Sequence, residues 1–314
     1  MRGIVAYNTD SHVIPTTRSN GILIAQVTPQ GGIVSGRSSI VQLDAWNWED
    51  AAIKMDEGIH MNWPRRMFGP RWWLGETNPR PNPRYAQTVQ AIRQTLSDGQ
   101  TYAKTKVPET TNLKMEAMRG LYDGSVALYL HADRAKDIVL AANLLKEYGV
   151  QKIVLVGGAQ AYYIKDFLKE NNIAVILRNV HSLPSREDED VDMPYRLPGM
   201  LHKAGVKVAL GYASHSSARN LGFFAGTAAT YGLDKEEALA CITLHPAQIL
   251  GIDDQVGTVE SGKNATFFVS EGDALDMRTQ SVVHAFIDGR EIDLNDKHKM
   301  LYERFSKKYE QMKK

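Results

Sequence analysis

The chain has 314 residues, of which 43% are hydrophobic and 23% are charged, and 37 basic against 36 acidic residues leave a formal charge of +1. This composition is typical of a folded globular protein and argues against an intrinsically disordered chain. The balanced charge argues against a general nucleic-acid binder, and no run approaches the roughly 18 apolar residues of a membrane span. The single cysteine, Cys241, excludes an intramolecular disulfide framework and a cysteine-rich zinc site.

The first hundred residues predict few regular elements. We interpret residues 6–21 as a polar loop, because they show neither an apolar run nor a capped helix. Apolar runs predict strands at 22–28 and 38–44, on either side of a glycine-rich loop. Residues 46–73 hold all five tryptophans, and the prolines and glycines among them exclude one long helix. We interpret this segment as a flap over the core edge or, alternatively, as an aromatic substrate rim that includes Trp46 and Trp48.

The middle of the chain alternates regularly between strands and helices. Continuous apolar runs predict strands at 125–132, 152–158, 173–180 and 206–212. Amphipathic patterns predict helices at 85–103, 111–122 (capped by Thr110 or Thr111), 133–148, 159–171 and 194–204. Four consecutive β/α units require a parallel sheet with right-handed crossovers. Strands that are apolar throughout are buried on both faces, which favours a barrel or a doubly wound sheet.

The pattern changes towards the C-terminus. Helices are expected at 220–231, 235–242 and 246–250, and His245 is expected to stand at the start of the last one. Short strands then follow, with tight turns at Ser261-Gly262 and Asp288-Gly289 that are typical of hairpins. Residues 297–314 predict a charged, solvated helix packed by a few apolar residues.

Three segments resemble one known family. Residues 232–292, which include ALACITLHPAQILG and VVHAFIDGREI, resemble the closing segment of the amidohydrolase superfamily, especially its imidazolonepropionase-like members. Residues 130–162 and 6–39 resemble the middle of the barrel in these proteins. The resemblance implies an α/β fold in which residues 1–251 form an incomplete (β/α)8 TIM-type barrel that lacks its first strand. It also implies part of a small β-sandwich at 252–294, a C-terminal helix at 295–314, and a Met1 that lies inside a larger fold.

The family resemblance also implies a chemistry. Relatives hydrolyse carbon–nitrogen bonds other than peptide bonds with water activated by a divalent metal, usually zinc. Their ligands are a His-x-His pair, a Lys or Glu, two further histidines and a final Asp, at the carboxyl ends of the strands. His131 matches one ligand position, whereas Gly157 stands where the family has a histidine. Ser214 or His215 stands near the position where the family has its final Asp. No His-x-His pair occurs, so we expect zinc to bind this chain weakly or not at all.

Other candidate site residues follow from their places at strand ends and in loops. His131, Asp133, His181 and His215 could form a makeshift metal site; alternatively, His131 is a buried histidine bonded to a neighbour. The carboxylates of residues 186–192 could bind a cation, although such a charge run is usually only solvated. Arg37, in the glycine-rich loop, could bind an anionic ligand and, with Trp46 and Trp48, contact a substrate.

These observations leave three functions open. The first is a metal-dependent hydrolase of carbon–nitrogen bonds with a small-molecule substrate, in which replacing His131 by Ala abolishes activity and replacing His202 does not. The second is an inactive relative that serves as a binding or structural partner, and the third is a sugar-binding module suggested by the tryptophans. Partners are then a second copy or a chain that supplies the missing N-terminal part. The first ten residues hold no apolar signal-peptide core, whereas longer look-alikes suggest an exported location.

Overall fold

A curled sheet of seven strands is the centre of the computed structural model, which describes residues 1–105, 108–178, 180–184, 188–212, 214 and 217–312. The strand order is β1-β2-β3-β6-β7-β8-β9. The strands are Ile24–Val27 (β1), Val34–Gln42 (β2), Ala52–Asn62 (β3), Ala127–Ala132 (β6), Ile153–Gly157 (β7), Ala174–Arg178 (β8) and Val208–Gly211 (β9). β1, β2 and β3 pair antiparallel, whereas β3 and β6 to β9 run parallel.

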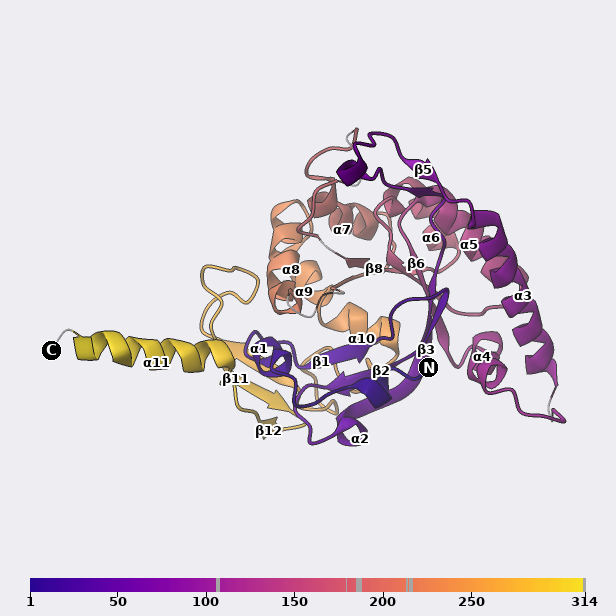
Figure 1. Ribbon diagram of the computed structural model, residues 1–314. Helices are drawn as coiled ribbons and strands as arrows, with labels where there is room; N and C mark the ends of the chain where they lie inside the picture. Colours follow the sequence, from indigo (N-terminus) through magenta and orange to yellow (C-terminus); the bar gives the residue numbers. More distant parts are fainter. Residues whose placement is uncertain (106–107, 179, 185–187, 213, 215–216, 313–314) are drawn as a thin grey trace.

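Helices cover the convex face of this sheet (Figure 1). The helices α3 to α9 are Tyr85–Lys104 (α3), Leu113–Asp123 (α4), Ala135–Glu147 (α5), Lys165–Glu170 (α6), Met193–Lys203 (α7), Leu221–Thr230 (α8) and Lys235–Ala240 (α9). Short elements are Ile4–Ala6 (η1), Val13–Arg18 (α1), Trp48–Ala51 (α2), Met67–Phe68 (β4), Trp72–Leu74 (η2), Arg80–Pro81 (β5), Ala161–Ile164 (η3) and Ala218–Asn220 (η4). The sheet is thus an incomplete TIM-type barrel, as expected.

The two faces of the strands bury different partners, because successive side chains on a strand point in opposite directions. Ile59, Leu128 and Leu155 lie on the convex face, in the large core beneath the helices. Tyr129 and Val156 lie on the concave face and pack against Leu250 of α10 (Leu244–Leu250). His60 and His131 share the concave parity of Tyr129, so they belong to the barrel interior. Burial on both faces explains why β6 to β9 are apolar throughout.

The N-terminal segments differ from expectation in two places. The segment that we interpreted as a flap contains β3, a central strand of the sheet, and the expected polar loop at 6–21 contains α1. β3 carries Glu57 and His60 with less than 7% of each side chain exposed. It forms because β2 and β6 satisfy its backbone on both sides, so pairing outweighs the polar sequence.

A second sheet lies beside α1. Its strands are Phe267–Ser270 (β10), Val282–Ile287 (β11) and Arg290–Glu291 (β12), and β11 and β12 form the expected hairpin at Asp288-Gly289. Ala285, Ile287 and Ile292 from this region bury Leu23, at the start of β1. The C-terminal strands therefore close one side of the antiparallel part of the main sheet.

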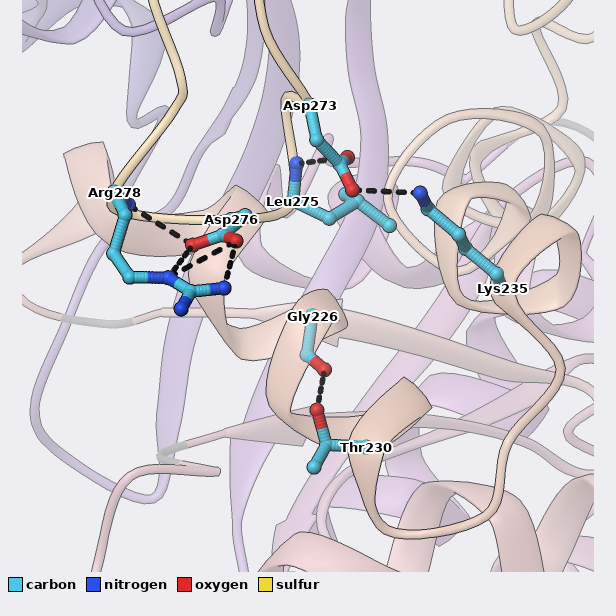
Figure 2. Close-up of polar contacts among 7 residues, drawn as sticks. All are labelled: Gly226, Thr230, Lys235, Asp273, Leu275, Asp276 and Arg278. Carbon is cyan, nitrogen blue, oxygen red and sulfur yellow. Dashed lines mark hydrogen bonds and ion pairs between the residues drawn. The ribbon is translucent and has the colours of Figure 1, made fainter.

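The loop between β10 and β11 fastens this sheet to the helices. Figure 2 shows Lys235 of α9 donating to Asp273 at 2.6 Å, next to an ion pair between Asp276 and Arg278. The chain approaches α8 so closely that a Cβ on Gly226 would lie 2.0 Å from the carbonyl oxygen of Leu275. Only glycine permits that approach. The loop is thereby seated on α8 and α9.

The C-terminal helix α11 (Lys297–Met312) extends away from the rest of the molecule (Figure 1) and buries none of its described residues. Its base is held by Asp296, whose carboxylate accepts hydrogen bonds from Ser19 at 2.6 Å and from the backbone of His298 at 2.7 Å. No helix among the described residues is long and apolar enough to cross a membrane.

Candidate functional site

Two histidines meet inside the barrel near the carboxyl ends of β3 and β6. His60 Nδ1 and His131 Nε2 are 2.8 Å apart and share a hydrogen bond. Burial, and next the neighbouring His131, lowers the pKa of His60 to about 3. Burial, and next the Arg178 guanidinium, lowers the pKa of His131 to about 4. Both rings are therefore neutral near pH 7, with one nitrogen donating and the other accepting.

A network of polar side chains next to the His60 ring positions this pair. The rings of His60 and Tyr129 stack with centroids 4.6 Å apart, and the Tyr129 hydroxyl donates to Glu57 at 2.9 Å. The other Glu57 oxygen accepts from Ser38 at 2.6 Å and from Gln26 at 2.7 Å. Burial, and next the Glu57 carboxylate, raises the pKa of Tyr129 well above its ordinary value. The buried carboxylate is thus satisfied by three donors, which fixes the ring that orients His60.

A cavity of about 220 Å³ opens at the carboxyl ends of β6, β7 and β8. Asp133 and Arg178 line it together with Glu189, and its apolar wall comes from the residues after β8 and the first turn of α7. Between the two charges lies Gly157, where a Cβ would stand 2.5 Å from Asp133 Oδ1 and 3.1 Å from Arg178 Nη2. The missing side chain therefore lets both charged groups approach the Gly157 backbone and come close to each other.

The structure separates the residues expected to form a makeshift metal site. His131 faces His60, Asp133 lines the cavity, and His181 bonds to Thr227 of α8 at 2.6 Å with its ring edge on Phe224. His215 lies outside the described residues, as do the first two positions of the 186–192 loop. Among the described residues, no group of three or more His, Cys, Asp or Glu side chains could hold a metal ion.

The described donors do not fit a zinc cage of the family type. Two imidazoles on one tetrahedral zinc would hold their ligating nitrogens roughly 3.3 Å apart, since each zinc–nitrogen bond is about 2.0–2.1 Å long. The two nitrogens of His60 and His131 are closer, at 2.8 Å, and are bonded to each other. The remaining ring nitrogen of His60, Nε2, is buried without a partner among the described residues.

Of the expected substrate contacts, Trp46 and Trp48 lie away from this edge, whereas Arg37 lies beside β3 near His60. Arg37 of β2 donates to the Asp56 carbonyl oxygen at 2.7 Å, and its backbone pairs with the first residues of the chain. Trp46 is 92% exposed in the connection that leads into the amino end of β3, and Trp48 packs there against the cluster around Val41. Active sites of such barrels lie at the carboxyl ends of the strands. Trp46 and Trp48 stand at the amino end of β3, whereas Arg37 pairs with Ile59 near its carboxyl end but turns its guanidinium to Asp56.

Sequence reasoning missed two residues that the geometry brings into the site. His60 lies in the segment interpreted as a flap; the alternation of Ile59 and Met61 with His60 and Asn62 is the signal that indicates a strand there. Arg178 was visible as a charged residue at the end of an apolar run, the position where barrel strands carry functional side chains.

The fold and the position of the site define a TIM-type barrel scaffold with titratable groups at the carboxyl ends of its parallel strands. The family model described as "Amidohydrolase family" matches residues 66–292, which is more than two thirds of the chain. The chain belongs to the amidohydrolase family. This membership supports hydrolase chemistry in general.

Two individual proteins illustrate the relationship. The crystal structure of an amidohydrolase from Thermotoga maritima MSB8 superimposes with a TM-score of 0.81 at 26% identity, over 92% of this chain and 76% of that one. Amidohydrolase tasK of Hapsidospora irregularis is 31% identical over 120 residues, which cover 34% of this chain and 12% of that protein. The chain thus matches only a small part of the length of this curated relative.

Proposed function

We propose that this chain is a non-catalytic, small-molecule-binding member of the amidohydrolase family, with its ligand in the cavity at the carboxyl ends of β6, β7 and β8. The observation that carries this proposal is the 2.8 Å hydrogen bond between His60 and His131, which turns these two imidazole rings towards each other. Among the described residues, no third ligand completes a metal cage around them. The cavity beside them combines an apolar wall with three charged side chains, as small-ligand sites do.

A second candidate is a hydrolase of carbon–nitrogen bonds other than peptide bonds. The family match over residues 66–292 and the place of His131 near the end of β6 favour it. Under this hypothesis the missing ligands come from residues outside the described part, His215 among them, or from another chain. The expected divalent metal, zinc first, then becomes a requirement for activity.

Metal analysis of the purified chain, expressed with zinc, iron and manganese supplied, separates the two candidates. The proposed function predicts less than about 0.2 mol of metal per mol of protein and no hydrolysis of N-acyl amino acids, lactams or hydantoins. About one mol of metal per mol, with hydrolysis of any of these compounds, would establish the second candidate instead.

A matched pair of variants tests whether His131 takes part in hydrolysis. If hydrolysis is found, His131→Ala should abolish it and His202→Ala should leave it unchanged, because His202 lies on α7 near Glu237, 3.6 Å away. Equal activity of the two variants would remove His131 from the reaction.

A further inference from the structure

The two charged side chains on either side of Gly157 do not form an ion pair with each other in the described part of the structure. Asp133 and Arg178 both line the cavity, yet within the described residues no ion pair joins them, and Arg178 Nε is buried without a hydrogen-bond partner. Opposite charges that share a partly desolvated space without pairing leave both groups able to bind a ligand.

The glycine between them determines how closely the two charged side chains approach each other. Gly157 has φ +106°, and a Cβ there would lie 2.5 Å from one charged group and 3.1 Å from the other. The Asp133 carboxylate and the Arg178 guanidinium therefore lie within about 6 Å of each other, and because both line the cavity, one small molecule in it can touch both. An α-amino acid carries an ammonium and a carboxylate on a single carbon, which is the charge spacing that this arrangement requires.

The rest of the cavity fits an apolar substituent. Val180, Met193 and Leu197 are among the side chains that form its wall, and Leu183, 79% exposed, stands at its rim. The volume, about 220 Å³, is smaller than the range typical of drug-sized ligands.

We infer that this cavity binds an apolar α-amino acid, with the ligand carboxylate on Arg178, the ligand ammonium on Asp133 and the side chain against the wall formed by α7. The inference rests on the proposed small-molecule binding at this edge of the barrel and names its ligand class. The guanidinium can hold a carboxylate through two parallel hydrogen bonds, which a lysine could not provide.

Isothermal titration calorimetry of the whole chain tests this assignment with L-leucine and two analogues. 4-Methylpentanoate lacks the ammonium, and leucinamide lacks the carboxylate. L-Leucine should bind, and each analogue should bind at least about 10-fold more weakly, because each loses one charge-assisted interaction. Arg178→Gln should remove the preference for L-leucine over leucinamide, and Asp133→Asn the preference over 4-methylpentanoate.

Arg134→Gln is the matched control, since it removes an exposed guanidinium from the residue next to Asp133 and should leave binding unchanged. No binding of L-leucine, L-valine or L-phenylalanine up to about 10 mM would overturn the assignment. Equal binding of L-leucine and both analogues would also overturn it, but would leave small-molecule binding in place. Failure of every compound in a thermal-shift screen of neutral and charged small molecules would overturn the proposed binding function as well.

Discussion

At the residue scale, the barrel interior holds a polar network that is satisfied among the described residues except at His60 Nε2. Glu57 is held by three donors, and His60 and His131 are held by one another. Buried polar groups of this kind add specificity only while their partners keep the right protonation state. The neutral histidine pair is therefore the part of the interior that responds to pH.

Stability should fall as pH drops below the ordinary histidine pKa of about 6.5. The pKa values of His60 and His131 in the folded chain are about 3 and about 4, so the unfolded chain binds protons that the folded chain does not. Their contribution is fully present above about pH 6.5 and is lost as the pH falls through about 4 for His131 and about 3 for His60. Urea unfolding at about pH 7.5 and about pH 5 should show a lower free energy of unfolding at the acidic pH.

His131→Gln should reduce this pH dependence, because one of the two titrating rings is removed and glutamine can still bond to His60. His12→Asn, at an exposed position before α1, should leave it unchanged. An identical pH dependence in wild type and His131→Gln would show that other groups control it.

At the element scale, helix starts depend on single side chains. The sequence predicts Thr110 or Thr111 as the cap of a helix at 111–122, but α4 begins two residues later, at Leu113, and Asn112 caps it. The Asn112 side-chain oxygen accepts from the backbone of Lys114 at 3.1 Å and of Met115 at 3.4 Å. Both types of residue favour the cap position, so composition alone could not choose between adjacent candidates.

Asn112→Ala should lower the free energy of unfolding by about 1 kcal/mol, since two amide donors lose their acceptor. Thr110→Ala and Thr111→Ala serve as controls and should each change it by less than about 0.5 kcal/mol. Chemical denaturation of the three variants measures the difference. A larger effect at either threonine than at Asn112 would mean that the helix starts earlier in solution.

Strands differ in how far their own sequence reveals them. β6 to β9 were predictable because continuous apolar runs can satisfy two buried faces. β3 was not, because Lys54, Glu57 and His60 interrupt its apolar pattern and their partners come from β2, β6 and α10. The candidate site was therefore only partly predictable: His131 lies at the end of a strand that the sequence reveals, whereas its partner His60 lies in β3, which the sequence does not reveal.

At the scale of the whole molecule, α11 stands apart from the core. Removing residues 301–314, which leaves Asp296 and its hydrogen bonds intact, should change the free energy of unfolding by less than about 0.5 kcal/mol, because no described residue of the helix is buried. Ile287→Ala, at a buried position of β11, should cost about 2–4 kcal/mol and provides the positive control. A large loss on truncation would show that the helix packs against the body in solution.

The contact between Leu23 and Ala285 has a consequence for synthesis on the ribosome. The residues that bury Leu23 are made some 260 positions after it, which takes roughly 10–50 s at ordinary translation rates. β7, β8 and β9 can pair in order as they are made, because each pairs with the strand made just before it. Leu23, directly before β1, stays uncovered during that interval, until the last strands are made and pack against it.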